Sequence, residues 1–199
     1  MNTGKRWNQN QKLKTDGVIE TVRGFISHLK IIAALGVVTA VHAVIVDDGT
    51  EQTITTDITN PDVTRVITAS AAGTAADIRA IQVVVNGTND NDEVITETLP
   101  AFTVNTAGSV TGSKAFKTVT SVVVPPHDGT GATTTIGVGA VLGIPYKLDH
   151  NTVLNTYLDG VHEGTDATVT TSKTAIESNT IDLNSDLDGS QVDVYLIVS

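Results

Sequence analysis

Apolar and polar residues alternate in short runs over most of the chain after residue 36. Runs rich in Val, Ile and Thr, such as 94–98 and 118–124, are typical of β-strands, because β-branched side chains pack well on a pleated surface. Asp-Gly or Asn-Gly pairs begin at residues 16, 48, 86, 128, 159 and 188, and at least four of them separate such runs. Hairpin signals at this spacing predict a mainly β fold, an antiparallel β-sandwich or barrel.

The pattern predicts a β-rich domain over 37–199, in which 151–199 form either part of the same domain or a separate C-terminal hairpin layer. Asp48-Gly49 predicts a hairpin between its two flanking strands, and residues 86–92 predict a second turn. The strands expected from the alternation cover 37–46, 51–59, 63–70, 78–85, 93–99, 110–112, 116–124, 133–138, 165–171, 180–183 and 191–198.

One segment before this domain has a helical period instead. Its apolar residues recur at spacings of three and four, which predicts one short amphipathic helix over 16–36. Asp16 can cap the helix, Gly36 can end it, and Gly24 inside it costs about 1 kcal/mol relative to Ala. The apolar stripe consists of Val18, Val22, Phe25, Ile26 and Leu29. Such a helix can lay this stripe on its own sheet or on a neighbouring subunit.

The charge is divided unevenly along the chain. Residues 1–30 hold six basic and two acidic residues, a sum of +4, whereas 31–199 hold six basic and twenty acidic residues, a sum of −14. Residues 1–15 are polar and predict an extended basic arm. An acidic body with a basic arm favours docking onto an acidic neighbour and disfavours direct binding of nucleic acid. The candidate partner-binding residues are Lys5, Arg6, Trp7, Lys12 and Lys14 of the arm and Val22, Phe25 and Leu29 of the predicted helix.

The rest of the composition bears on disulfides, metal sites and membrane contact. The chain has no Cys, so neither disulfides nor thiolate metal sites are available. Its longest apolar run, 31–46, is shorter than the roughly 20 residues of a membrane-spanning helix, and we expect no membrane interaction. Charged residues make up 17%, below the usual quarter or so, which is consistent with surfaces that pack against other surfaces.

Candidate chemistry is sparse. Ser27-His28-Leu29-Lys30 matches the Ser-x-x-Lys pattern of acyl-enzymes, but the companion motifs are missing from the sequence. The polar run 89–93 could offer oxygen ligands to calcium, although it lacks the spacing of an EF-hand loop and a polar hairpin turn is the simpler interpretation. The five histidines are scattered, and no phosphate-binding loop is present. We therefore expect a protein without enzymatic activity, cofactor or metal.

Several short motifs suggest a family. They are Pro61-Asp62-Val63-Thr64-Arg65, Val94–Thr98, then Gly112, Lys114, Phe116 and Thr118–Val122, then Gly137, Gly139 and Leu142-Gly143-Ile144-Pro145, and finally 177–181 and 187–190. Over roughly 58–198 this arrangement resembles small β-rich virion proteins of tailed bacteriophages, mostly those of the head decoration (cement) type. Residues 1–35 match nothing in that family.

The resemblance implies a capsid decoration protein made in the host cytoplasm and located on the virion surface. Its expected partners are the major capsid protein and other copies of itself, as a homotrimer that stabilises the head shell. A host-surface or glycan-binding module of a head fibre or tail is the alternative, as is a tail tube or baseplate protein. Exposed aromatic residues beside carboxylates would favour glycan binding. With seven aromatic residues, of which we expect only Tyr146 and Tyr157 near one surface, the decoration role is favoured.

Overall fold

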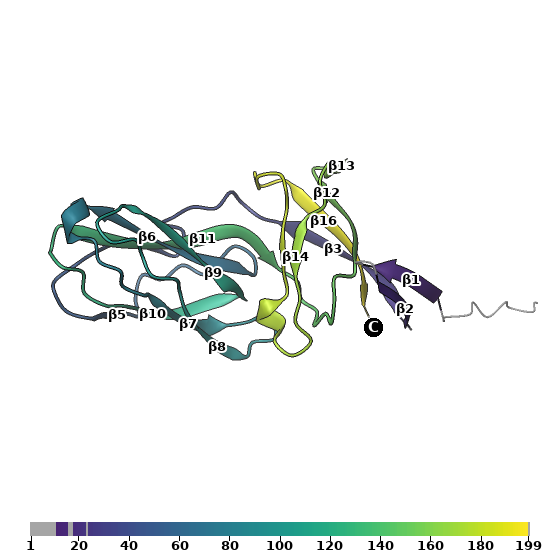
Figure 1. The fold of residues 1–199 in the computed structure, drawn as a ribbon, viewed down its shortest axis with the longest axis horizontal. Helices are drawn as coiled ribbons and strands as arrows, with labels where there is room; N and C mark the ends of the chain where they lie inside the picture. The colour runs from purple at the N-terminus through teal and green to yellow at the C-terminus, as the bar shows by residue number, and fades with distance from the viewer. Residues whose placement is uncertain (1–10, 16–17, 23, 199) are drawn as a thin grey trace, which may run out of the picture.

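The computed structural model describes residues 11–15, 18–22 and 24–198, and for the first two of these segments it describes the backbone only (Figure 1). Sixteen strands and two three-residue 3-10 helices, Ala75–Asp77 and Ile176–Ser178, make up this described part, so the predicted mainly β class is confirmed. The strands are β1 (Gln11–Thr15), β2 (Val18–Val22), β3 (Phe25–Ile32), β4 (His42–Val46), β5 (Gln52–Ile54), β6 (Arg65–Gly73), β7 (Val84–Thr88), β8 (Val94–Thr98), β9 (Gly108–Phe116), β10 (Thr118–Val124), β11 (Ala132–Gly143), β12 (Val153–Leu158), β13 (Val161–His162), β14 (Thr168–Thr170), β15 (Thr180–Asp182) and β16 (Gln191–Val198).

Two antiparallel sheets form a sandwich at one end of the molecule. One sheet has the order β5-β10-β7-β8, and the other has the order β14-β15-β11-β6-β9, with β4 also paired to β11. Aliphatic side chains from both sheets meet in a shared core, among them Val85 and Val122 from the first sheet and Ile67 and Ile136 from the second. The expected alternation of inward apolar and outward polar residues therefore holds for this half of the chain.

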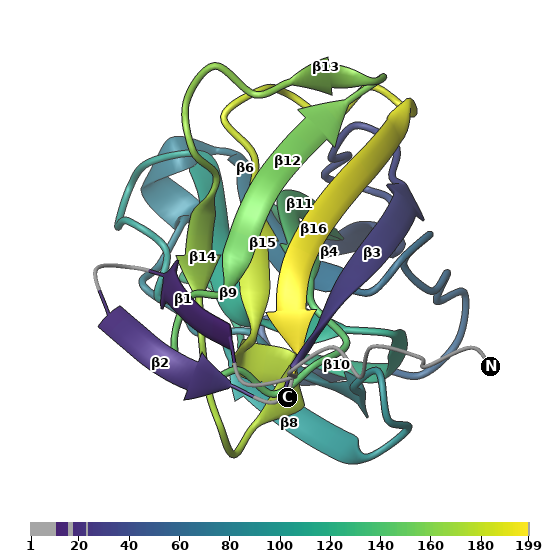
Figure 2. The ribbon, with the colours of Figure 1, turned by 90° about the vertical axis from the view of Figure 1, so that its right-hand side faces the viewer.

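A third sheet covers the other end of the long second sheet. Its order is β13-β12-β16-β3, and Figure 2 shows β12, β16 and β3 side by side, facing the viewer. The inward residues of β16, including Val194 and Leu196, pack with Leu142 of β11 and Ile181 of β15 in a second core. Residues 151–199 thus do not form a layer alone, because β14 and β15 extend the sheet of β11 whereas β12, β13 and β16 pair in a sheet that β3 completes.

Strand β11 joins the two cores. Its first half contributes Ile136 and Val138 to the sandwich core, and Leu142 near its end belongs to the second core. The register with β6 shifts between Val138 and Leu142, where the extra residues form a bulge. The bulge redirects the strand, so a single continuous β11 contributes to both cores.

Within the predicted helix over 16–36, residues Phe25–Ile32 form strand β3, so the prediction is wrong for this part. In β3 the partly buried residues are Ser27, Leu29 and Ile31, which is a period of two. All eight residues of β3 pair with β16, so backbone hydrogen bonding to a neighbouring strand outweighed a weak helical pattern that already contained Gly24. The predicted arm is partly a strand as well, since β1 pairs with β2. The arm's residues 1–10 lie outside the described residues.

Two of the predicted turns have different roles in the structure. Asp48-Gly49 does not close a hairpin, because β4 pairs with β11 while β5 pairs with β10 in the opposite sheet. Asn86-Gly87 lies inside β7, and the turn to β8 follows it at Asn89–Asp92, where Asp92 has a φ of 62°. The hairpin of β7 and β8 itself is present as predicted.

Candidate interaction surface

Exposed apolar side chains are concentrated in one part of the sequence. Of the twelve large hydrophobic residues that are exposed among the described residues, eight lie between residues 25 and 46. These eight are Phe25, Ile26, Ile32, Leu35, Val37, Val38, Val44 and Val46, and we call them the apolar track. Single exposed apolar residues are ordinary on protein surfaces, but such a concentration in one stretch of the sequence makes this stretch the candidate interaction surface.

The first part of the track lies on β3, which is an edge strand of the C-terminal sheet. Phe25 is 66% exposed at the start of this strand, and Ile26 and Ile32 project outward from it. Leu29 instead faces inward and packs against the second core. An exposed edge strand can accept a further strand from a partner through its unpaired backbone groups.

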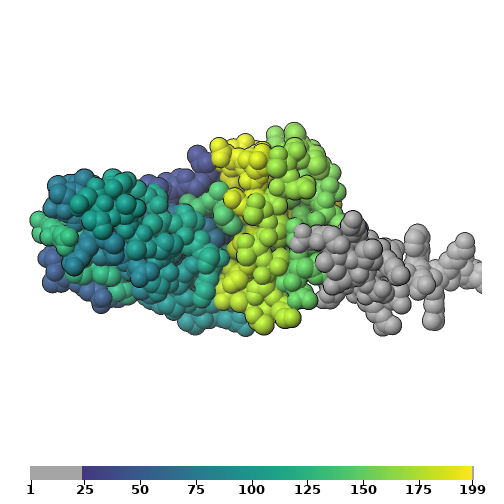
Figure 3. Space-filling model, in the orientation of Figure 1, coloured from purple at the N-terminus to yellow at the C-terminus, as the bar shows by residue number. Residues whose placement is uncertain are grey.

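The second part of the track is the segment 33–41, which runs from the C-terminal sheet to the sandwich. Val37 accepts a backbone hydrogen bond from Val138 N–H and Val41 N–H donates one to Ile136, so this segment lies along β11. The approach is close enough that a Cβ on Gly137 would collide with the Val37 carbonyl. Figure 3 shows part of this segment, coloured dark blue, at the surface where the sandwich meets the C-terminal sheet.

The guanidinium of Arg65 holds the start of this segment by a hydrogen bond to Ala34. Arg65 is fully buried, and its Nη1 donates to the Ala34 carbonyl at 2.9 Å and to Asp62 at 3.0 Å. Its Nε and Nη2 both donate to the carbonyl of Gly139 in the β11 bulge. A cavity of about 330 Å³ lies beside this clamp and is lined mainly by Leu35, Val37, Pro61 and other residues of the two adjoining loops. The clamp therefore fixes the backbone at Ala34, at the start of the segment that carries Leu35, Val37 and Val38.

Asp62 completes the clamp as a partly exposed carboxylate. Burial raises its pKa, but hydrogen bonds from the Ala34 N–H and from Arg65 outweigh that effect, so the pKa of Asp62 lies below its ordinary value of 3.8. The carboxylate is ionised at neutral pH and balances the buried guanidinium. In this way Pro61–Arg65, one of the motifs behind the family resemblance, has a structural role here.

The sequence-predicted partner-binding residues fall into three groups. Lys5, Arg6 and Trp7 lie outside the described residues. Lys12, Lys14 and Val22 lie on β1 and β2, whose backbones alone are described. Phe25 belongs to the apolar track, whereas Leu29 is a core residue of the C-terminal sheet.

Residues 32–46 of the track were not predicted as a surface. The run 37–46 is apolar at nearly every position, which indicates a strand buried on both faces. In the structure only 42–46 form a strand, and only Val41 and Ile45 of the run are buried apolar residues. An apolar run that exceeds what one core can cover is the signal that could have revealed the surface.

The candidate catalytic and metal-binding patterns do not assemble into sites. Ser27 and Lys30 project from opposite faces of β3, and the Ser27 hydroxyl is 3.0 Å from the Tyr146 hydroxyl. Asn89 stabilises its own turn: its Oδ1 accepts the backbone N–H groups of Asn91 and Glu93, both at 3.0 Å. In the part of the chain that the structure describes, no three His, Asp or Glu side chains converge as metal ligands.

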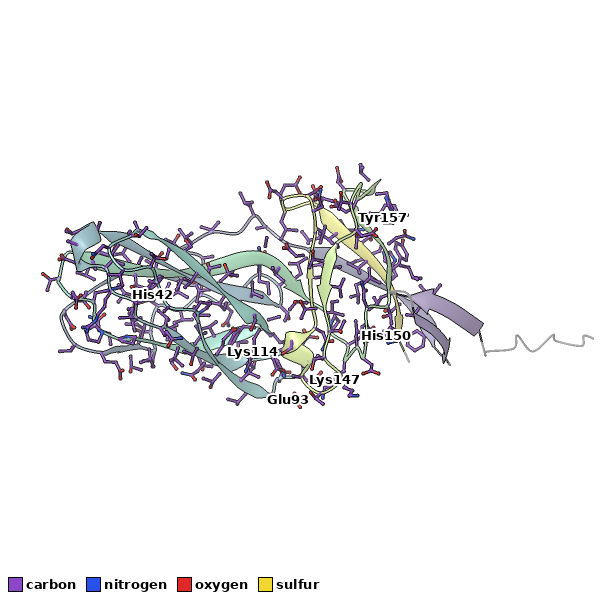
Figure 4. The ribbon with its side chains drawn as sticks, viewed as in Figure 1. His42, Glu93, Lys114, Lys147, His150 and Tyr157 are labelled. Atoms are coloured by element: carbon purple, nitrogen blue, oxygen red, sulfur yellow. The ribbon has the colours of Figure 1, made fainter. Side chains whose placement is uncertain are left out.

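Three of the histidines, His42, His127 and His150, lie in separate parts of the structure. Figure 4 shows His42 in the sandwich and His150 in the C-terminal half. His127 is buried, where its Nδ1 accepts the Arg79 N–H at 3.1 Å and its Nε2 lies 3.2 Å from the Thr134 hydroxyl. Burial lowers the pKa of His127, against the opposing influence of Asp47 and Asp128. This histidine is therefore neutral and structural, because its Nδ1 must stay unprotonated to accept the Arg79 N–H.

Comparison with known proteins assigns neither a family nor a function to the chain. No protein-family model matches the chain, and neither the curated proteins nor the solved structures include a significant match. Among the described residues there is no helix long and apolar enough to cross a membrane. The functional argument therefore depends on this chain's own surface.

Proposed function

We propose that this protein is a bacteriophage capsid decoration protein that binds the outside of the head shell and stabilises it. The observation that carries the proposal is the apolar track, which places eight exposed hydrophobic side chains along 25–46. The track directly follows the basic residues 1–23, and the rest of the chain is acidic. Apolar area supplies affinity and the basic segment supplies orientation towards an acidic partner.

The mechanism is burial of surface at seams between shell subunits. Each Å² of apolar surface removed from water contributes about 25 cal/mol, so an interface above about 1,000 Å² can hold subunits together against internal pressure. The track extends from the edge strand β3 to β4, so a partner that covers it contacts two different sheets of the molecule. The partners proposed are the major capsid protein and neighbouring copies of this chain in a homotrimer, with no direct contact to nucleic acid or membrane.

The test uses heads that lack this protein. Wild type and the double variant Leu35→Ser/Val38→Ser are mixed with these heads, and the bound fraction is measured after sedimentation. We expect binding to weaken at least tenfold in the variant, because two anchors of the track lose their apolar side chains. Val94→Ser/Val104→Ser is the matched control, since both residues are exposed and lie outside the track.

The stabilising role is tested on the same particles by heating. Heads decorated with wild type or with the control variant should release their DNA at a higher temperature than bare heads. Equal rupture temperatures for decorated and bare heads would contradict the cement role, and undiminished binding by the Leu35→Ser/Val38→Ser variant would contradict the track as the shell-binding surface.

A further inference from the structure

The outer face of the C-terminal sheet carries a cluster of rings that the sequence did not predict. Tyr195 of β16 lies opposite His28 of β3 and Asn155 of β12, and Tyr157 lies opposite His162 of β13. Directly opposed residues project from the same face of a sheet, so these side chains form one surface. The expectation that Tyr146 accompanies Tyr157 is wrong, because Tyr146 packs against the second core.

The rings form a continuous row with measured contacts. His28 stacks on Tyr195 with centroids 4.3 Å apart and planes 11° from parallel. Tyr157 then meets Tyr195 edge-on at 5.9 Å, and His162 meets Tyr157 edge-on at 5.1 Å. Each ring is thus held by its neighbour, and a ligand would lose little additional side-chain entropy on binding to them.

Planar polar groups lie among these rings. The Asp193 carboxylate accepts from His28 Nε2 at 2.6 Å and from Gln191 Nε2 at 2.8 Å, which fixes its position between β3 and β12. Asn155 accepts from His162 through its Oδ1 at 3.2 Å. Within the described part of the chain, the hydroxyls of Tyr157 and Tyr195 and the Nδ2 of Asn155 have no hydrogen-bond partner.

A groove at the edge of β12 shares Asn155 with this face, although Val153, Thr156 and Ala167 of its lining lie on the side of the second core. It has a volume of about 190 Å³ and lies between β12 and the loop that follows β13, with walls formed largely by Asn151, Asn155, Thr156 and Asp166. The lining is mostly polar, and the rings of Tyr157 and His162 lie on the neighbouring positions of the same strands. Figure 4 shows Tyr157 at the upper edge of the C-terminal sheet.

We propose that this face binds a neutral saccharide chain. Aromatic rings offer apolar area to the C–H faces of a sugar, and fixed carboxamide, carboxylate and phenol groups offer hydrogen bonds to its hydroxyls; a ligand site commonly combines these two kinds of group. Asp193 and Asp166 bring negative charge, and 31–199 as a whole sum to −14, so sialylated, sulfated or other anionic glycans are repelled. The saccharide-binding face is separate from the groups of the apolar track that the shell-binding test changes.

The test is a titration of the full-length protein, uniformly labelled with ¹⁵N, with neutral hexose and N-acetylhexosamine oligosaccharides, followed by amide chemical shifts. We expect saturable shifts centred on 155–162 and 191–195, at ligand concentrations up to about 10 mM, ten times the dissociation constant of a weak complex. Tyr157→Ala should weaken the binding at least tenfold. Tyr146→Phe is the control, because it changes the third tyrosine of the chain, which lies away from this face.

Three results would overturn the proposal. The first is the absence of shifts on this face with every neutral oligosaccharide tested. The second is equal binding of a sialylated or sulfated oligosaccharide. The third is unchanged binding by Tyr157→Ala and by Asn155→Ala, an exposed substitution that removes no ring, although it removes the hydrogen-bond partner of His162, and so separates loss of the site from loss of the fold. If Tyr157→Ala lowers attachment to heads while no saccharide binds the wild type, the face is a protein-docking surface instead.

Discussion

The buried clamp of Arg65 gives the sharpest test of how this chain is held together. We consider Arg65→Met, which keeps an apolar side chain of similar length but removes the guanidinium. The carbonyls of Gly139 and Ala34 then lose their hydrogen-bond donor. Water cannot replace the guanidinium there, because the Arg65 side chain is fully buried. Asp62 also loses its ion pair, although this carboxylate is 37% exposed and can be rehydrated.

The expected cost follows from these contacts. Breaking a buried charged network by removing one partner costs about 3–5 kcal/mol. Because Asp62 can regain water, we expect the low end, about 3 kcal/mol. For a chain of 150–250 residues each kcal/mol lowers the melting temperature by roughly 2–4 °C, so the variant should melt about 6–12 °C below wild type.

The assay is urea and thermal unfolding followed by far-UV circular dichroism, with near-UV signal as a second probe. Coincident transitions are required, because a chain with two cores can unfold in two steps. Asp62→Asn is the companion variant, and it should cost less than Arg65→Met, since the side-chain oxygen of Asn can still accept from Arg65 and from the Ala34 N–H, although the buried guanidinium loses its counter-charge. A loss below about 1 kcal/mol for Arg65→Met, or equal losses for the two variants, would refute the clamp as a main link between the segment 33–41 and β11.

Three further outcomes follow from the structure. Phe25→Ala should change the unfolding free energy by no more than about 0.5 kcal/mol, because the ring is mostly exposed, but it should weaken binding to heads; a large loss of stability in urea would place the ring in a core. Gly137→Ala should destabilise the fold by about 1–3 kcal/mol, because its Cβ would collide with the Val37 carbonyl, and crystals or amide exchange should show the segment 33–41 displaced. His127 should make stability depend on pH: its pKa in the folded protein lies below the ordinary 6.5, so the folded state binds fewer protons than the unfolded state, and stability should fall as the pH drops below about 6.5. His127→Gln should flatten that decline, and an unchanged profile would contradict the assignment.

The strands were predictable where one face is buried and the other is wet. In β8, Val94–Thr98, burial alternates strictly, with Ile95 and Glu97 buried between exposed neighbours. Its β-branched residues were the signal for a strand, whereas the exposure of Val94 and the burial of Glu97 were not predictable from the sequence. Turn chemistry was less informative, because Asp-Gly or Asn-Gly reports a local backbone preference and not which strands pair. The chain after Asp48 crosses to the opposite sheet, and that choice is made by the cores on either side, through contacts far apart in sequence.

The incorrect prediction of a helix within 16–36 has a physical cause. The same cause explains why the surface features of β3 were not predicted. Residues 25–32 contain apolar groups at both helical and alternating spacings, so the sequence alone does not decide between them. The decision comes from β16, which lies about 165 residues away in the chain (His28 pairs with Tyr195, and Asp193 with Lys30) and offers eight backbone partners. The same pairing places His28 against Tyr195 and so creates the ring row, which no local pattern indicates.

The apolar track and the proposed saccharide-binding face therefore both include residues of β3. The strand's edge and the segment that follows it offer apolar contact to a partner, whereas His28 and Lys30 belong to the polar and aromatic face that β3 forms with β16. Ile26 and Ile32 of the track project from this same face, so the two surfaces adjoin along β3. A decoration protein that covers a shell with one side needs its other surfaces to face the medium. If the track is buried against the shell, the outer face of the C-terminal sheet can bind a ligand only when the shell does not cover its rings. Head binding and saccharide binding measured together on one decorated particle decide this: simultaneous occupancy supports two separate surfaces, and mutual exclusion means that β3 can serve only one partner at a time.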